Sequence, residues 1–291
     1  MRTLGIGKPV VINCYAKINL TLEILGKRAD GYHEVRTVMQ TVGLADRLEV
    51  TAAEKLTVTC SDPVLATPDN LVYRAGRLLQ EEYGVRMGAA LRLEKRIPVA
   101  AGLGGGSSDA AGTIVALNRL WDLRLSLSEQ QRVAARLGSD VPFFLTGGTA
   151  LATSRGEKIT PLPSLPSHWV VLVSPPVALS TAAVYGSVVP SDYTSGVATA
   201  DTVAAAQHGT LLPQTRWYNA LARPAHALAP EIKAGQAALL RAGAQYAHVS
   251  GSGPTVFTVC RDEAAARTLA AGLQRHGFHA APVQLVPSSR A

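Results

Sequence analysis

The sequence predicts an α+β protein of two domains. The chain has 291 residues, which is long for a single hydrophobic core. Its first half mixes strand and helix patterns, and its second half follows the order β, helices, β, β, α, β of a ferredoxin-like domain. Between the halves, residues 161–168 are rich in proline and serine. We therefore expect an N-terminal domain over residues 1–163 and a C-terminal domain over residues 164–291.

The N-terminal domain begins with strand patterns. Residues 11–25 are rich in β-branched and apolar side chains, which favours a strand, and residues 26–34 form a polar turn. Further strands or sheet-edge segments are predicted over residues 35–44, 46–53 and 55–61.

The first helix is predicted over residues 69–84. Apolar side chains recur there at helical spacing, Asp69 or Asn70 can cap its start, and Gly84 ends it. A strand over residues 88–99 then leads into a glycine-rich loop.

Two more helices follow the glycine-rich loop. One leaves the loop over about residues 108–120. The other covers about residues 127–137, with Ser126 or Ser128 as its cap.

The C-terminal domain begins with a buried strand, because residues 169–176 are mostly apolar. A less regular helical region runs to about Ala242, and within it the small and polar residues 190–209 predict a mobile loop with a short helix. The remaining elements are a hairpin with Gly-Ser-Gly-Pro at its turn, a helix and a last strand, at residues 246–260, 263–275 and 279–286.

The charge of the chain is compatible with a negatively charged partner. Its 28 basic and 21 acidic residues give a net charge of +7, which suits nucleic acid, a membrane surface or an anionic small molecule. The basic residues are scattered rather than clustered, which argues against nucleic acid. No apolar run approaches the roughly 20 residues of a membrane helix, so we expect neither a nucleic-acid nor a membrane partner.

The cysteines and the N-terminus predict a cytoplasmic location. Three cysteines, at positions 14, 60 and 260, lie far apart without a metal-binding spacing, which is typical of reduced thiols that pack in a core. The first twenty residues lack the continuous apolar segment of a secretion signal, because Gly5, Gly7, Lys8 and Pro9 interrupt it. The sequence does not choose between a monomer and a homodimer.

The stretch "PVAAGLGGGSSDAA", residues 98–111, predicts an anion-binding loop. Glycine lets the backbone N–H groups approach a ligand closely, and the N-terminus of the following helix favours negative charge. No lysine follows as in GxxxxGK[ST], and Ser107 stands where GxGxxG requires glycine. The alternative is an ordinary flexible loop.

Four segments of the chain resemble motifs of the GHMP small-molecule kinases. The glycine loop resembles their phosphate-binding motif, "AKINLTLEILGKRADGYHE" their N-terminal motif and "VSGSGPTVF" their C-terminal glycine motif, and "LGSDVPFFLTGGTAL" completes the pattern. The resemblance extends from about residue 13 to residue 286 and is weakest over residues 186–245.

This resemblance implies a fold and an activity. The fold is the two-domain GHMP kinase fold, with an N-terminal domain like domain 2 of ribosomal protein S5 and a C-terminal ferredoxin-like domain. The activity is phosphorylation of a small-molecule hydroxyl by ATP, accompanied by Mg²⁺. Gly31-Tyr32-His33 and the triple glycine before Ser107 are similar to the family members that act on a cytidylyl substrate, and differ from mevalonate and homoserine kinases.

The resemblance places the ATP triphosphate on the glycine loop and adenine beside Asn70. Ser107 or Ser108 would also touch Mg²⁺ or a phosphate oxygen, although either serine can instead cap a helix. Asn70 has the same alternative. The implied ATP-binding residues of the loop are Pro98, Val99, Ala100, Ala101, Gly102, Leu103, Gly104, Gly105, Gly106, Ser107 and Ser108.

Lys17 and Asp140 are the candidate catalytic residues. Each lies among apolar neighbours, so we expect them to pair and to offset one another's desolvation. The resemblance makes Asp140 the acceptor of the substrate's hydroxyl proton. It implies that Lys17 keeps Asp140 charged and stabilises the phosphoryl group during its transfer. The alternative is a purely structural ion pair. The family usually has alanine where this chain has Ser139.

The resemblance also implies the substrate-binding residues. Tyr32 and Tyr185 would stack on cytosine, and His33 would hydrogen-bond its edge, although a Tyr-His turn is otherwise ordinary surface. Asn19 lies on the same strand face as Lys17 and can bind the substrate's diol or phosphate. The further implied contacts are Thr181 near the same pocket and Gly251, Ser252 and Gly253 beside the diphosphate, where the alternative is a simple hairpin turn.

Two rival functions stay open on the sequence alone. One is another GHMP kinase, such as a homoserine or mevalonate-type kinase. The other is a nucleic-acid-binding module, because both predicted domain folds occur in such proteins. Aromatic residues make up only 5% of the chain and no RNP-type motif is present, which disfavours the second.

Overall fold

The computed structural model describes residues 8–287. Its contacts group the chain into two compact units, whose parts alternate along the sequence. Of the described residues, unit 1 comprises residues 8–16, Leu44–Ile97 and Gly104–Leu145. Unit 2 comprises Lys17–Gly43, Pro98–Leu103 and residues 146–287. The domain boundary near residue 163 stays a prediction, as do the outer ends of both predicted domains, which include residues outside the described range.

Two long strands belong in part to each unit, β1 (Val10–Lys27) and β2 (His33–Ala53). In unit 1 the second half of β2 pairs antiparallel with β4 (Gly88–Glu94), and β3 (Thr57–Cys60) pairs parallel with β4. The remaining elements that begin in this unit are α1 (Leu71–Tyr83), α2 (Gly105–Leu120), α3 (Leu127–Leu137), α4 (Val141–Thr146) and the short 3₁₀ helix η1 (Pro63–Leu65).

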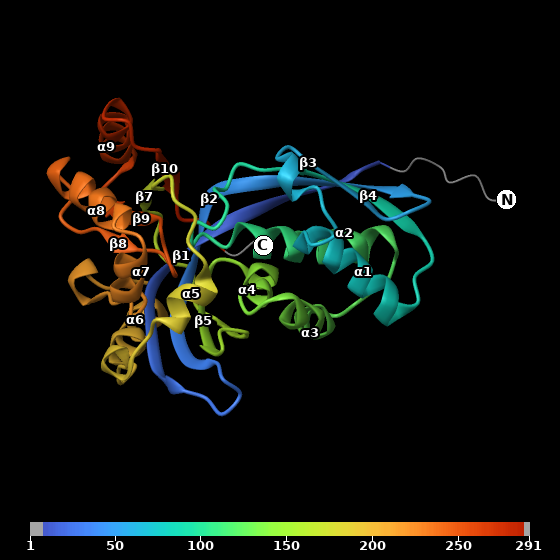
Figure 1. Ribbon diagram of the computed structural model, residues 1–291, viewed down its shortest axis with the longest axis horizontal. Helices are drawn as coiled ribbons and strands as arrows, with labels where there is room; N and C mark the ends of the chain where they lie inside the picture. Colours follow the sequence, from blue (N-terminus) through green and yellow to red (C-terminus); the bar gives the residue numbers. More distant parts are fainter. Residues whose placement is uncertain (1–7, 288–291) are drawn as a thin grey trace. The chain divides into compact units, whose positions relative to one another are not determined.

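Helices α1, α2 and α3 contact one another and lie on one side of β3 and β4 (Figure 1). Between them and the strands lies an apolar core that includes Leu48, Leu91 and Leu79. Helix α2 approaches β1 closely, because a Cβ on Gly112 would stand 2.6 Å from the Cys14 sulfur. Glycine at position 112 therefore permits this close approach of α2 to β1.

Local signals in unit 1 explain the helix ends. The Asn70 side chain caps α1 by accepting from the Val72 N–H at 2.9 Å, and Gly84 ends α1 with φ 64°. Ser126 caps α3 in a capping box with Glu129. The predictions for these helices are confirmed, with Asn70 and Ser126 as the caps.

Three predictions for the first half of the chain need correction. Residues 35–44 and 46–53 belong to one continuous strand, β2. The strand predicted over residues 88–99 ends at Glu94. Helix α2 begins at Gly105, with Gly104 at φ 71° before it and no capping side chain, so Ser107 and Ser108 lie inside the helix and do not cap it.

In unit 2 the first half of β2 pairs antiparallel with β5 (Thr149–Ser154), which pairs with β6 (Lys158–Pro161). A second, antiparallel sheet has the strand order β10-β7-β9-β8. Its strands are β7 (Trp169–Val173), β8 (His248–Val249), β9 (Val256–Cys260) and β10 (Ala280–Gln284).

The helices of unit 2 complete the predicted order of elements. They are α5 (Thr181–Gly186), α6 (Val197–Gln207), α7 (Ala222–Leu228), α8 (Glu231–Arg241) and α9 (Glu263–Arg275), with 3₁₀ helices η2 (Pro190–Asp192) and η3 (Gln214–Arg216). The order β7, helices, β8, β9, α9, β10 confirms the ferredoxin-like pattern. The segment 190–209 contains the eleven-residue α6.

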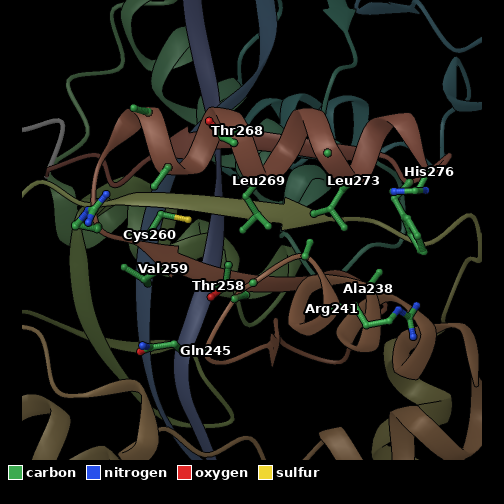
Figure 2. Close-up of a pocket in the computed structure, with 18 of the residues that line it drawn as sticks. Ala238, Arg241, Gln245, Thr258, Val259, Cys260, Thr268, Leu269, Leu273 and His276 are labelled. Atoms are coloured by element: carbon green, nitrogen blue, oxygen red, sulfur yellow. The ribbon is translucent and has the colours of Figure 1, made fainter.

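A cavity of about 1230 Å³ lies in unit 2 between α8, β9 and α9 (Figure 2). Leu269 and Leu273 of α9, Thr258 and Cys260 of β9, and Arg241 of α8 line it. None of the residues that line it is among the predicted site residues.

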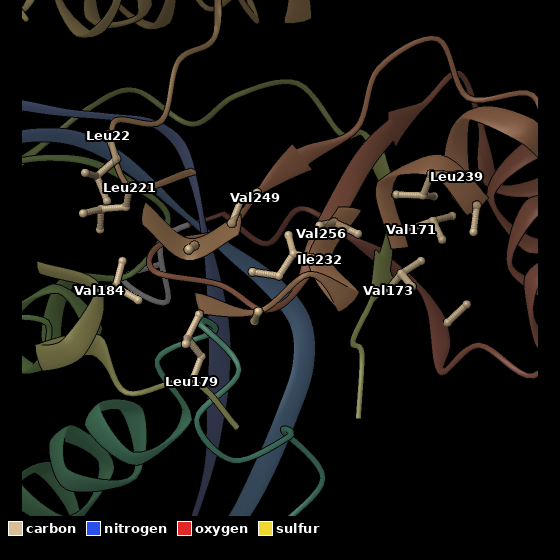
Figure 3. Close-up of a cluster of buried hydrophobic side chains, with 14 of the residues drawn as sticks. Leu22, Val171, Val173, Leu179, Val184, Leu221, Ile232, Leu239, Val249 and Val256 are labelled. Atoms are coloured by element: carbon tan, nitrogen blue, oxygen red, sulfur yellow. The ribbon is translucent and has the colours of Figure 1, made fainter. Parts of the chain in front are cut away.

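The core of unit 2 joins the second sheet to its helices (Figure 3). Val173 of β7 and Val256 of β9 lie in it together with Ile232 and Leu239 of α8. Among residues 8–287, no helix is long and apolar enough to cross a membrane.

Candidate active site

Lys17 and Asn19 lie together on the buried face of β1. They are two residues apart, so the alternation of a strand places them on one side. The exposed fractions are 3% for Lys17 and 4% for Asn19. Lys17 Nζ donates to Asn19 Oδ1 at 2.7 Å and to the Gly102 carbonyl at 3.1 Å. The side chains predicted to face one way are therefore joined, and the amine contacts the glycine loop.

The first part of the glycine loop is held against the segment 250–255. The Ser250 hydroxyl donates to the Gly102 carbonyl at 3.0 Å, and the Thr255 N–H donates to the Ala101 carbonyl at 3.2 Å. Gly102 has φ 75°, and a Cβ there would stand 2.3 Å from the Ser250 carbonyl oxygen. Glycine is required at this position by both conformation and space.

Gly251 lies close to the side chains of Lys17 and Asn19. It has φ 55°, and a Cβ there would stand 3.0 Å from Lys17 Nζ and 3.2 Å from Asn19 Oδ1. Asn219 holds this turn, because its Nδ2 donates to the Val249 and Gly251 carbonyls at 2.8 Å each. Sequence reasoning missed Asn219, which lies where the family resemblance is weakest.

Two predicted substrate contacts lie next to this turn. The Ser252 and Thr181 hydroxyls are 2.9 Å apart, and Thr181 is the first residue of α5. Gly253, with φ 76°, packs against Ile232 rather than facing open space. The structure therefore brings Thr181, Ser252, Gly251, Lys17 and Asn19 into one neighbourhood of unit 2.

The second part of the glycine loop begins α2 in unit 1. The N-cap residue of this 16-residue helix is Gly104, which has no side chain to accept from the first N–H groups, and no side-chain capping bond is made there within residues 8–287. A Cβ on Gly105 would meet Ile97 at 3.0 Å and Lys95 Nζ at 3.2 Å. Bare backbone and an uncapped helix start are features that suit an anionic ligand.

A buried charge cluster supports this helix start. Lys95 Nζ donates to Asp46 and, at 2.8 Å, to Asp109 Oδ2. Asp46 Oδ1 accepts from the Arg96 and Ile97 N–H groups at 2.5 and 2.8 Å. Lys95 therefore ties the residues that enter the glycine loop to Asp109, which follows it.

The cluster has one more negative than positive charge, and its pKa values reflect this. Burial raises the pKa of Asp109 to about 7, with a further contribution from Asp46, although Lys95 opposes it. Burial also raises the pKa of the Cys14 thiol, and Asp109 adds to the effect. The pKa of Lys95 is raised by Asp109 and Asp46 despite its burial. Sequence reasoning missed this cluster.

Two of the three predicted base-binding side chains, His33 and Tyr185, lie together in unit 2. The His33 and Tyr185 rings are 5.7 Å apart and stacked at 29°, and Tyr193 lies at 6.3 Å from His33 on its edge. Burial and then Lys27 lower the pKa of His33, which favours its neutral ring over the charged one. Tyr193 was not predicted, because it lies in the segment of weakest resemblance.

Tyr32 stands apart from this stack. Its side chain is 54% exposed, and the guanidinium of Arg155 lies 4.7 Å from its ring centre. Arg28, in the same turn, donates to the Ser154 hydroxyl at 3.1 Å. The Gly-Tyr-His turn is therefore attached to the turn between β5 and β6.

Asp140 and Asn70 belong to unit 1. Asp140 is half-buried immediately before α4, and its carbonyl accepts from the Phe143 N–H at 3.2 Å. Asn70 uses Oδ1 to cap α1 and Nδ2 to bind the Leu65 carbonyl at 2.8 Å. The capping alternative for Asn70 is thus confirmed, and its adenine contact stays a prediction, as does the pairing of Asp140 with Lys17.

The comparisons with known proteins agree with the motifs. Residues 70–148 match the model of the GHMP kinase N-terminal domain, and residues 208–279 match that of the GHMP kinase C-terminal domain. A 4-diphosphocytidyl-2-C-methyl-D-erythritol kinase of Bacillus cytotoxicus is 40% identical over 270 residues, which is 91% of this chain and 93% of the relative. The chain belongs to this kinase family. The 4-diphosphocytidyl-2-C-methyl-D-erythritol kinase of Brevibacillus brevis is 42% identical over 260 residues, covering 88% of this chain and 89% of the relative.

Solved structures support the same family and fold. A crystal structure of a 4-(cytidine 5'-diphospho)-2C-methyl-D-erythritol kinase matches with a TM-score of 0.81 and 36% identity, over 95% of this chain and 99% of that one. A homoserine kinase from Cytophaga hutchinsonii matches with a TM-score of 0.73 at 18% identity, over 99% of this chain and 97% of that one, which shows the fold alone. The predicted GHMP kinase fold is confirmed.

Proposed function

We propose that this protein transfers the γ-phosphoryl group of ATP to the 2-hydroxyl of 4-diphosphocytidyl-2-C-methyl-D-erythritol. This is a step of the non-mevalonate, or methylerythritol phosphate, pathway to isoprenoids. The observation that carries the proposal is the 40% sequence identity, over 91% of this chain, to a 4-diphosphocytidyl-2-C-methyl-D-erythritol kinase. The hydrogen bond from Lys17 to the glycine loop agrees with it. A homoserine or mevalonate-type activity has only fold-level support, at 18% identity for the homoserine kinase.

ATP is held by backbone in this proposal. The triphosphate lies along residues 98–108, where the uncapped start of α2 offers N–H groups and a positive dipole end. Among residues 8–287 no group of three or more acidic, His or Cys side chains is arranged to hold a metal. Mg²⁺ accompanies ATP in this proposal, within reach of Ser107 or Ser108, and neutralises phosphate charge when bound.

Lys17 and Asp140 carry out the chemistry. Asp140 takes the proton of the substrate hydroxyl as the hydroxyl oxygen forms its bond to the γ-phosphorus. The bond between that phosphorus and the ADP oxygen breaks, and ADP leaves with the electron pair. Lys17, held by Asn19 and the Gly102 carbonyl, directs its positive charge toward the moving phosphoryl group.

Aromatic side chains of unit 2 recognise the cytosine base in this proposal. Tyr32 and Tyr185 stack on the base, and His33 hydrogen-bonds its edge, with a lowered pKa that favours its neutral ring. Thr181, Ser252 and the backbone of Gly251 and Gly253 bind the diphosphate side of the substrate. The cytoplasmic location and the choice between monomer and homodimer stay predictions.

The test is a coupled ADP-release assay with a panel of acceptors. We expect Mg²⁺-dependent ADP release with 4-diphosphocytidyl-2-C-methyl-D-erythritol and none above background with homoserine or mevalonate. Folding is checked first by circular dichroism. A folded protein that releases ADP with homoserine or mevalonate, or with no acceptor in the panel, would contradict the proposal.

A further inference from the structure

Thr37 lies behind the Lys17–Asn19 pair and makes two hydrogen bonds. It stands on β2, with its side chain buried against β1. Its hydroxyl donates to the Thr21 carbonyl at 2.5 Å and accepts from Asn19 Nδ2 at 2.8 Å. All of these residues belong to unit 2.

These bonds fix the orientation of the Asn19 amide. A threonine hydroxyl has one proton, and the Thr21 carbonyl can only accept. The Thr37 oxygen must therefore accept from Asn19, so the amide nitrogen points to Thr37 and the amide oxygen points to Lys17. A lysine amine can only donate, so both neighbours of Asn19 require the same orientation.

We propose that Thr37 is a positioning residue for phosphoryl transfer, acting through Asn19 on the amine of Lys17. The inference deepens the proposed function and rests on the role given there to Lys17. The Thr21 carbonyl orients the Thr37 hydroxyl, this hydroxyl orients the Asn19 amide, and the amide orients Lys17 Nζ. Thr37 therefore influences the direction of the amine without contacting it. Asn19 then serves mainly to aim Lys17 rather than to bind the diol of the substrate.

The residues around Thr37, Asn19 and Lys17 leave little room for these side chains to move. The turn at Gly251 lies against both Lys17 Nζ and Asn19 Oδ1, at 3.0 and 3.2 Å from where its Cβ would stand. Thr37 and Asn19 are each 4% exposed, so water does not easily replace a lost partner. Loss of the Thr37 hydroxyl therefore leaves the Asn19 amide nitrogen without this acceptor, and of the two neighbours only Lys17 still fixes the orientation of the amide.

Thr37→Val removes the hydroxyl and keeps the shape of the side chain. We expect kcat to fall about 10- to 100-fold, because small displacements of a charged group at the reaction centre cost about that much. The KM for ATP should stay within about twofold, since backbone N–H groups hold the triphosphate. Thr37→Ser keeps the hydroxyl and should restore kcat to within about threefold of wild type.

Thr41→Val is the matched control. Thr41 lies on the same strand, is also 4% exposed, and its Oγ1 has no hydrogen-bond partner within residues 8–287. The same methyl-for-hydroxyl exchange there should leave kcat unchanged. If Thr37→Val does not fold, Thr37→Ala takes its place with the same expectation.

The outcomes separate this inference from the proposed function. Wild-type protein is assayed first for ADP release with the cytidylyl substrate, and its failure would contradict the proposed function itself. With active wild type, a Thr37→Val kcat within twofold of wild type overturns the inference. So does a Thr37→Ser variant as slow as Thr37→Val, or an equal fall in kcat for Thr41→Val. A fall confined to Thr37→Val, with KM for ATP preserved, supports it.

Discussion

Asp109→Asn should remove a pH dependence of the free energy of unfolding that comes from the buried cluster of Lys95, Asp46 and Asp109. Asp109 is 2% exposed, its Oδ1 has no hydrogen-bond partner among the described residues, and it shares Lys95 with Asp46. Burial, and then the charge of Asp46, raises its pKa from 3.8 to about 7 despite Lys95. Asparagine keeps the shape and cannot take the charge.

The sign and size of the effect follow from proton linkage. Because the folded-state pKa of Asp109 lies above the unfolded value, the folded chain keeps a proton that the unfolded chain releases between about pH 4 and pH 7. The contribution of Asp109 is therefore fully present below about pH 4 and is lost as the pH rises through about 7. Each pH unit between about pH 4 and pH 7 lowers the free energy of unfolding of the wild type by about 1.4 kcal/mol. About two such units lie between pH 5 and pH 8, so the total change there is on the order of 3 kcal/mol.

Urea unfolding at pH 5, 6, 7 and 8 measures this contribution. The free energy of unfolding of Asp109→Asn minus that of wild type should rise by about 3 kcal/mol from pH 5 to pH 8. Asp69→Asn removes an exposed carboxylate of the same unit and serves as the control, with a flat difference. A difference for Asp109→Asn that stays constant within about 1 kcal/mol would refute the reasoning.

Three further substitutions test the site. Asp140→Asn should lower kcat about 10²- to 10⁴-fold while calorimetry finds both ligands still bound; retention of more than about a tenth of wild-type kcat would exclude Asp140 as the proton acceptor. His33→Ala should raise KM for the cytidylyl substrate about 5- to 150-fold and leave KM for ATP unchanged, and an equal rise in both would assign the turn a structural role only. Gly102→Ala should lower the free energy of unfolding by about 1–3 kcal/mol, because of its φ of 75° and the Ser250 carbonyl; Gly106→Ala, with ordinary contacts, is its control, and equal Tm values for the two variants would contradict the account.

Local signals in the sequence predicted local structure well. The ends of α1 at Asn70 and Gly84 follow from apolar spacing and caps. The helix predicted over residues 263–275 has the same bounds in the structure. The shared face of Lys17 and Asn19 follows from strand alternation, and the structure joins their side chains. In each case the determining interactions lie within a few residues along the chain.

Interactions between distant residues could not be predicted in this way. Lys95 and Asp46 are 49 residues apart, and each looks like an ordinary surface charge in its own segment. Asn219 holds carbonyls 30 and 32 residues away, from a segment without a recognisable motif. Thr37 resembles any threonine of a strand until β1 is placed beside it. Only the folded backbone brings these groups together.

The measurement that tests the central claim most directly is the phosphorus NMR spectrum of the reaction product. The 2-carbon of the substrate also carries the methyl group, so a phosphate ester on the 2-hydroxyl has no hydrogen on its carbinol carbon. We expect one new phosphomonoester signal without coupling to a carbinol proton, with the diphosphate signals of the cytidylyl substrate retained, and with release of an equal amount of ADP. A signal split by a carbinol proton, which indicates transfer to a primary or secondary hydroxyl, would contradict the account, and so would the absence of a phosphomonoester.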